Sequence, residues 1–291
     1  MPLQQLVEYF NDRLEREHNS QHRPFMLQAE AVKGRFGSVQ IGTRLLPIRE
    51  IRNGDRILGY AARTGFEAGQ GADLDRATDA RQPEDSIINF DRLSRTVHML
   101  NFLPQTHLDE LLFLDVDPRH VLGVKADHGA YFEEVIIKCG LQTERVVINL
   151  PLSREYARFY PLLLKGLQNY QKRGYGLAVS ISDYRLDDKA VAALIERAMP
   201  DFVKLAAPSE AAFNNEDELQ QIRKLKRLID AQQGRCILVD VDDKPAADCM
   251  TALGFELAQG RYVEQMVAEP SQKPEAADGA AQLKLNRVIA R

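Results

Sequence analysis

The sequence lacks several features that would assign it quickly to a functional class. Its 291 residues include no tryptophan and only three cysteines, and no two cysteines form a CxxC pair. Neither the GxGxxG motif of dinucleotide-binding folds nor the GxxxxGK[ST] phosphate-binding loop occurs. No apolar run approaches the roughly 20 residues that a transmembrane helix needs. These absences disfavour a doubly wound nucleotide-binding sheet and exclude a recognisable membrane span.

Charge and cysteine usage bear on the kind of ligand and on the compartment that we expect for this protein. The net charge is -4, with 38 basic and 42 acidic residues, so there is no overall signature of nucleic-acid binding. We interpret the basic run at residues 223–227 as a solvated helix face. Cys139, Cys236 and Cys249 lie among apolar residues, as free thiols do in a reducing compartment. The first residues do not follow the layout of a signal peptide, and we expect a cytoplasmic protein.

From residue 36 onward, apolar strand patterns alternate with helical patterns. Residues 38–48 predict a strand, and an Asn-Gly turn at 52–55 predicts that the next strand, 56–61, runs antiparallel to it. The later strands are uniformly apolar, as in sheets buried on both faces. The remaining predicted strands are 111–116, 145–150, 177–181, 201–206, 236–241 and 256–260; the predicted helices are 87–103, 128–139, 153–172, 187–198, 215–231 and 245–253. Together they predict an α/β fold, a modified (β/α)8 TIM-like barrel with an antiparallel first strand.

Two extensions flank this barrel, which we place at residues 31–267. Residues 1–30 form an N-terminal extension with an amphipathic helix, whose stripe packs on its own domain or, alternatively, on a partner or a second copy. Residues 268–291 have a linker composition and end in a basic segment that could form a short helix. We expect a mobile loop at 64–86 and a Ser153 cap at the start of the helix at 153–172, with Asn214 or Asn215 capping the helix at 215–231. The stripe is Leu3, Leu6, Val7, Phe10 and Leu14.

Six phrases of the sequence, in order, resemble EAL domains, the family of cyclic di-GMP phosphodiesterases. The opening phrase "LPIREIRNGDRILGYAAR" (46–63) is similar to the family's "QPI…TGRIVGYEALLR". The others are "LFLDVDPRHV" (112–121), "GLQTERVVINLPLS" (140–153), "GYGLAVSISDY" (174–184), "MPDFVKLA" (199–206) and "CILVDVDDKPAADCMTALGFELAQG" (236–260). The resemblance spans residues 38–260 and implies a barrel with a reversed first strand.

The same resemblance implies that catalysis has been lost. The family uses two divalent metals held mainly by carboxylates at the carboxyl ends of the strands. Acidic positions of the family fall on side chains that are neutral or apolar here: Ala61, Asn149, Ser180, Ile181 and Val239. Asp115 stands where the family has Asn, Lys204 and Gln259 match its Lys and Gln, and Asp242 matches its late acid. A bulge could bring Asp240 into the metal site, whereas Asp183 would need a three-residue displacement.

We therefore expect no metal centre, no catalytic residue and no cofactor. A buried lone ammonium is costly, so we expect Lys204 to pair with an acid such as Asp115 or Asp242 in a structural polar plug. The histidines at 98, 107, 120 and 128 lack metal-ligand spacing. Ser180 lacks the sequence context of a nucleophile elbow.

Three functions remain open. The favoured one is a regulator of motility, biofilm formation or gene expression that works by protein binding, alone or as a homodimer. The alternative is a receptor that binds cyclic di-GMP without cleaving it, with Arg63 and Lys204 contacting phosphates. The third is a residual phosphodiesterase. A TIM-barrel function of another kind also stays open. The ligand-binding candidates are Arg63, Asp115, Lys204, Asp240, Asp242 and Gln259.

Overall fold

Eight strands close into a barrel, because the first and the last of them pair with each other. The computed structural model describes residues 2–18, 23–51, 56–66, 84–105, 109–124, 129–182, 188–207 and 216–268. Strand β3 runs antiparallel to both of its barrel neighbours, and the remaining barrel pairs are parallel. The barrel strands are β3 (Val39–Glu50), β4 (Ile57–Phe66), β5 (Leu111–Asp115), β6 (Val146–Leu152), β7 (Gly176–Ile181), β8 (Phe202–Ala206), β9 (Arg235–Val239) and β10 (Leu257–Ala258). The predicted barrel with a reversed first strand is confirmed.

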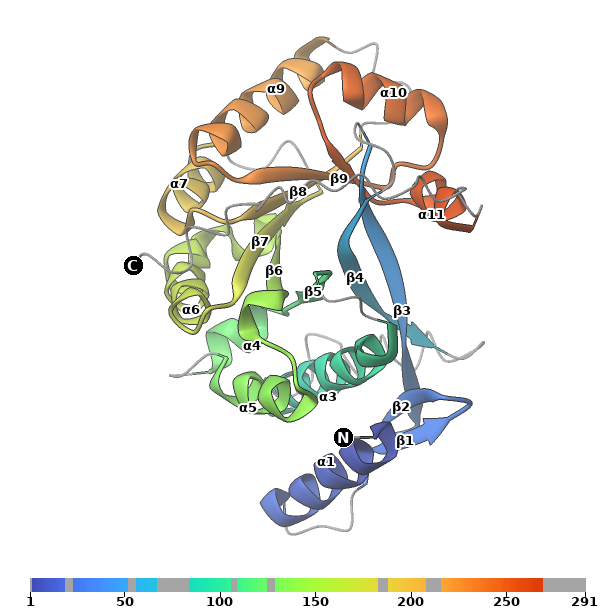
Figure 1. Ribbon diagram of the computed structural model, residues 1–291. Helices are drawn as coiled ribbons and strands as arrows, with labels where there is room; N and C mark the ends of the chain where they lie inside the picture. Colours follow the sequence, from blue (N-terminus) through green and yellow to red (C-terminus); the bar gives the residue numbers. More distant parts are fainter. Residues whose placement is uncertain are drawn as a thin grey trace.

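Helices surround the ring of strands (Figure 1). They follow the expected signals: α9 carries three acids in its first turn, and Asp243 caps α10 by accepting a hydrogen bond from the Ala246 amide at 2.8 Å. The helices are α3 (Glu84–Phe102), α4 (Pro118–Gly123), α5 (Ala130–Cys139), α6 (Tyr160–Lys172), α7 (Asp188–Ala198), α9 (Glu216–Ala231), α10 (Lys244–Ala252) and α11 (Arg261–Ala268), with 3-10 turns η1 (Leu103–Gln105), η2 (Thr143–Arg145) and η3 (Arg154–Phe159). None of the described helices is both long and apolar enough to cross a membrane.

The two faces of the strands bury separate cores. Paired residues on neighbouring strands share a face, and Ala61, Phe113 and Val147 are paired in this way inside the barrel. They belong to a small apolar cluster that fills the barrel interior. The larger core lies between the strands and the helices, because successive side chains of a strand point to opposite faces.

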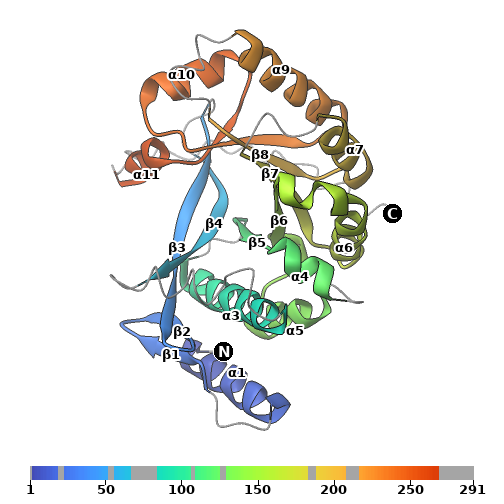
Figure 2. The ribbon, with the colours of Figure 1, turned by 180° about the vertical axis from the view of Figure 1, so that it is seen from behind.

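An N-terminal unit lies outside the ring. Helix α1 (Leu3–His18) packs on a hairpin of β1 (Phe25–Gln28) and β2 (Ala31–Phe36), and β2 extends the sheet beside β3. Both ribbon views place this unit at the end of β3 opposite α10 (Figures 1 and 2). Phe10 is buried in the core shared with the barrel, and the Asn11 amide bonds both backbone groups of Phe25, at 2.8 and 3.0 Å. The apolar stripe therefore packs on its own domain.

Several local predictions need correction. The sequence did not predict β1, β2, α4 or α11, which are too short for a clear periodic signal. Residues 154–159 form a 3-10 turn before α6, and the Ser153 side chain makes no capping bond. The predicted boundary between residues 30 and 31 falls in the turn between β1 and β2. The division into three segments stays a prediction.

Strand β4 is longer than predicted. It continues beyond residue 61 to Phe66, because its antiparallel ladder with β3 carries on through the pairs Thr43–Thr64 and Ile41–Phe66. The first residues of the predicted 64–86 loop are therefore strand. Residues 84–86 of the predicted loop begin α3. Residues 67–83, the Asn-Gly turn, the caps at 214 and 215, and the tail beyond residue 268 lie outside the described residues.

Candidate functional site at the barrel mouth

The carboxyl ends of the strands bring a layer of polar side chains above the apolar interior. Asp115 and Asn149 are paired, as are Ser180 and Lys204, and each lies two residues beyond an apolar member of the interior cluster. Side chains two residues apart on a strand share a face. The sequence argument thus gathered these four residues correctly at one end of the barrel.

Ala61 does not lie at this end. Because β4 runs on to Phe66, Ala61 is a buried interior residue level with Phe113, and Arg63 occupies the next inward position. Ile181 is the neighbour of Ser180 and belongs to the outer core between strands and helices. The methyl group at 61 and the isoleucine at 181 are therefore packed apolar side chains.

Four mouth residues form a continuous hydrogen-bonded chain. Arg63 Nη1 donates to Asp115 Oδ2 at 3.1 Å, and Asn149 Nδ2 donates to Asp115 Oδ1 at 2.7 Å. Ser180 Oγ then donates to Asn149 Oδ1 at 2.9 Å. Asp115 is the acid among these four hydrogen-bonded residues, and both of its carboxylate oxygens accept a bond. Its neighbours therefore hold it in place.

Lys204 departs from the prediction that it pairs with an acid. Its side chain is 2 % exposed, and its Nζ has no hydrogen-bond partner among the described residues. Nζ lies 5.1 Å from the centroid of the Phe113 ring. Burial lowers the pKa of Lys204 to about 8, opposed by the charge of Asp115 and assisted by that of Arg63. The ammonium thus faces an aromatic ring, and the Asp115 carboxylate is bound by Arg63 and Asn149.

The remaining predicted residues are dispersed around the rim. Asp242 is exposed and binds Arg261 Nη2 at 2.8 Å, so it does not pair with Lys204. Asp240 is exposed, with a left-handed backbone (φ 63°) directly after β9. Val239 is partly buried against the interior cluster. Gln259 is buried, and its Oε1 has no hydrogen-bond partner in the described part of the chain.

These side chains do not fit a pair of divalent metals. Of the inward-facing residues at 63, 115, 149, 180 and 204, only Asp115 is acidic, and two are cationic. No group of three or more His, Cys, Asp or Glu within the described ranges is placed to hold a metal ion. Hard cations need several oxygen ligands, and the positive charges of Arg63 and Lys204 would repel them.

A cavity of about 430 Å³ opens beside the mouth. It shares Arg63 and Asp115 with the polar chain, and Arg119 lines it from α4. His98 lines it from α3, with Nδ1 2.8 Å from Thr43 Oγ1. Burial lowers the pKa of His98 to about 4, against the charge of Asp115, so the ring is neutral at physiological pH. His98 and His120 are both buried.

A buried charge cluster in the cavity wall was not predicted. Asp91 and Arg95, one turn apart on α3, form an ion pair, and Asp91 Oδ2 lies 3.1 Å from His120 Nδ1. Asp91 Oδ1 also accepts a hydrogen bond from the Asp117 amide at 3.1 Å. The i,i+4 spacing of Asp91 and Arg95 was the signal in the sequence that could have indicated this ion pair. It predicts a surface pair equally well, so only the packing of α3 reveals the burial.

No family model and no curated protein sequence matches this chain. Solved structures do. BlrP1 of Klebsiella pneumoniae, in a complex with manganese and cyclic di-GMP, is 17% identical, with a TM-score of 0.62 over 76% of this chain and 54% of BlrP1. The YkuI protein of Bacillus subtilis, with an EAL domain, in complex with cyclic di-GMP and calcium, is 17% identical, with a TM-score of 0.60 over 85% of this chain and 59% of YkuI.

A third match is close in length to this chain. It is a standalone EAL protein from Vibrio cholerae in a form bound to cyclic di-GMP, 16% identical, with a TM-score of 0.60 over 77% of this chain and 91% of that protein. By contrast, this chain spans between half and two thirds of BlrP1 and YkuI. At such low sequence identities the likeness shows a shared fold and nothing more. The chain has the barrel fold of EAL proteins.

Proposed function

We propose that this chain is a catalytically inactive EAL-like signalling protein that acts by binding. The observation that carries the proposal is the composition of the barrel mouth. Asp115 is the one carboxylate among the described inward-facing residues at 63, 115, 149, 180 and 204, and it already accepts hydrogen bonds from Arg63 and Asn149. Two metal ions in one site require several carboxylates to offset their mutual repulsion. The described inward-facing residues, one engaged acid and two cations among them, do not supply these carboxylates.

We infer that the protein acts through a regulatory protein partner, in the control of motility, biofilm formation or gene expression. The hydrogen-bonded chain from Arg63 to Ser180 supports this choice, because it joins neighbouring strands by bonds that a ligand would have to break. The outer helices are then the surfaces left for recognition. We place the protein in the cytoplasm on the basis of its free cysteines.

A second candidate is a receptor for cyclic di-GMP. The cavity beside the mouth favours it, because Arg63 and Arg119 line a space within the size range of ligand pockets. Lys204 also retains unused donors for a phosphate. The three similar solved structures are complexes with this dinucleotide.

Two measurements on the full chain test the proposal. Incubation with cyclic di-GMP in magnesium or manganese should give no turnover. Turnover that disappears in an Asp115→Ala variant would overturn the proposal in favour of a residual phosphodiesterase that uses Asp115, Asp240, Asp242, Lys204 and Gln259. Calorimetry with the same dinucleotide, with and without metal, separates the two binding functions. Flat heats favour the protein partner, and binding that Arg63→Gln weakens favours the receptor.

A further inference from the structure

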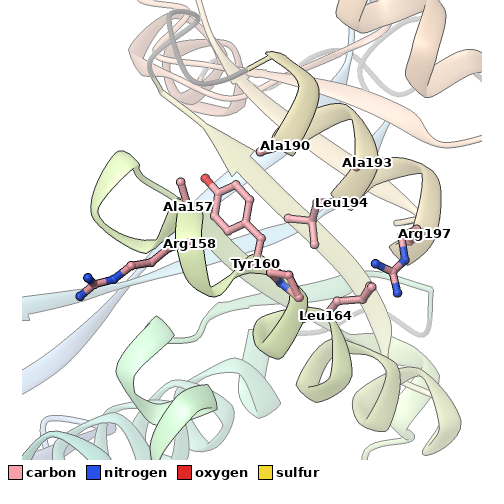
Figure 3. A pocket seen from close by; sticks show the side chains of 9 residues that line it. Ala157, Arg158, Tyr160, Leu164, Ala190, Ala193, Leu194 and Arg197 are labelled. Carbon is pink, nitrogen blue, oxygen red and sulfur yellow. The ribbon is translucent and has the colours of Figure 1, made fainter.

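A small hollow lies between two outer helices and shares no lining residue with the cavity at the mouth. Its floor and walls come from Tyr160 and Leu164 on α6 and Leu194 on α7 (Figure 3). The facing positions Ala190 and Ala193 carry only methyl groups, so the two helices leave a space of about 210 Å³. Small residues on one helix opposite large residues on the next are the physical cause of this groove.

The groove is apolar and has a fixed wall. Tyr160 and Leu164 are 4 % and 3 % exposed, and the Tyr160 hydroxyl donates to the Ser153 carbonyl oxygen at 3.2 Å. Ligand pockets for small molecules usually exceed about 300 Å³. This hollow is smaller, and its size suits one bulky apolar side chain of another molecule.

Two arginines frame the groove. Arg158 and Arg197 also line it, and in Figure 3 they lie on opposite sides of the apolar residues. Both are exposed, and neither forms an ion pair with another residue of the described chain. The Arg158 guanidinium rests on the Phe159 ring, with its Cζ 4.6 Å from the ring centroid. No acidic residue lines the groove in the part of the chain that the structure describes, and the two arginines make both of its ends positive.

We propose that this groove binds a segment of a protein partner in which a bulky apolar side chain is flanked on both sides by carboxylates. The apolar side chain fills the hollow, and the carboxylates accept paired hydrogen bonds from Arg158 and Arg197. Buried apolar anchors and arginines are the groups that dominate binding energy at interfaces. This inference rests on the proposed function and specifies the chemistry of the partner.

Charge argues against two other occupants. The last residues of this chain carry Lys284, Arg287 and Arg291 and no acid, so docking them here would bring cations onto Arg158 and Arg197. A second copy whose two-fold axis passed through the groove would place the same positive groove against itself. Both pairings are repulsive, whereas an acidic segment is attracted.

Selection from a displayed library of short random peptides on the full chain tests the proposal. We expect a consensus with a large apolar residue flanked by Asp or Glu. A synthetic peptide with that consensus should then bind at least about tenfold more weakly to Ala193→Leu, which fills the hollow, and to Arg158→Glu/Arg197→Glu, which reverses its charge. Lys165→Glu, an exposed residue of α6 outside the groove, is the matched control and should bind as the parent chain does.

The outcomes are separable. A consensus without acids, or a consensus peptide whose affinity the groove variants do not change, overturns the proposal. A chain that is dimeric in solution and becomes monomeric in Ala193→Leu would assign the groove to self-association. Binding to vesicles of phosphatidylglycerol that the peptide cannot displace would assign the arginines to a membrane. None of these readouts involves hydrolysis, so turnover of cyclic di-GMP would refute the proposed function without affecting the groove result.

Discussion

Arg95 and Lys204 are both cations buried in this protein, and their surroundings differ completely. Arg95 forms an ion pair with Asp91, donates to the Tyr170 hydroxyl at 3.4 Å and lies 3.8 Å from the Phe132 ring centroid. Lys204 has only the Phe113 face at 5.1 Å and no hydrogen-bond partner among the described residues. The two are 1 % and 2 % exposed, so burial alone does not explain the difference.

The difference follows from the chemistry of the two groups. A guanidinium stays protonated under all ordinary conditions, so a buried arginine needs a permanent partner. An ammonium can lose its proton, and burial brings the pKa of Lys204 down to about 8. Arg95 therefore ties α3 to its neighbours as a structural element. Lys204, by contrast, has donors at the mouth that no described residue accepts from.

The largest expected effect comes from breaking the paired cation. Arg95→Met leaves the Asp91 carboxylate buried without its partner, and we expect the free energy of unfolding to fall by about 3–5 kcal/mol. Urea unfolding measures this change. Arg223→Met removes an exposed arginine that is paired with Glu216, and this control should cost no more than about 1 kcal/mol. Equal losses in the two variants would contradict the comparison.

Removing the cation that lacks a partner should have the opposite sign. Lys204 has a lower pKa in the folded chain than in the unfolded one, so the folded chain binds fewer protons between pH 8 and pH 10.5 and stability rises with pH there. Below pH 8 the buried ammonium costs roughly 3 kcal/mol. Lys204→Met should therefore be as stable as the parent chain or more stable at pH 7, and this gain should vanish near pH 10.5.

Unfolding curves at several pH values measure this effect, with the exposed Lys165→Met as the matched control. A Lys204→Met variant that is strongly destabilised at pH 7 would mean that Lys204 has a partner in solution. The contrast with Arg95 would then be lost.

His98 is a third buried basic group, and we expect its ring to be neutral in the folded chain. Its pKa of about 4 lies below the usual 6.5, so the folded chain resists protonation and stability falls as the pH drops from 6.5 to 4. At pH 5 this group should cost roughly 2 kcal/mol. We expect His98→Gln to reduce the loss of stability between pH 7 and pH 5. If His98→Gln loses as much stability between pH 7 and pH 5 as the parent chain does, the lowered pKa of His98 is contradicted.

The smallest effect concerns the fine control of Lys204. The charge of Asp115 raises the pKa of Lys204 and that of Arg63 lowers it. Asp115→Asn should therefore lower this pKa and Arg63→Gln should raise it, each by less than about one unit because both partners are partly exposed. NMR of ¹³C-dimethylated lysine measures the titration, and shifts of the same sign in both variants would be inconsistent with this geometry.

Much of the architecture could be predicted from the sequence because the signal is local. Uniformly apolar strands separated by helical periodicity predicted the barrel, and the Asn-Gly turn predicted that β3 and β4 are antiparallel, as observed. The carboxyl ends of parallel strands meet at one end of a barrel, so Asp115, Asn149, Ser180 and Lys204 could be grouped before any coordinates.

The partners of those side chains could not be predicted in the same way. Asp115 can bond only a few neighbours, and whether it binds Lys204 or Arg63 depends on how far β4 extends. The antiparallel ladder with β3 carries β4 to Phe66 and brings Arg63 to the mouth, which a polar stretch read as a loop does not reveal. Likewise, an i,i+4 Asp–Arg pair reads the same in sequence whether it is exposed or buried.

Periodicity and residue type are local properties, so the closed barrel and its reversed strand could be predicted before any coordinates. The coordinates were needed to find that Asp115 binds Arg63 and Asn149, that Lys204 rests on an aromatic ring, and that Asp91 and Arg95 are buried. Hydrogen bonds and ion pairs act over a few ångströms, so their assignment waits until packing has fixed which side chains are neighbours.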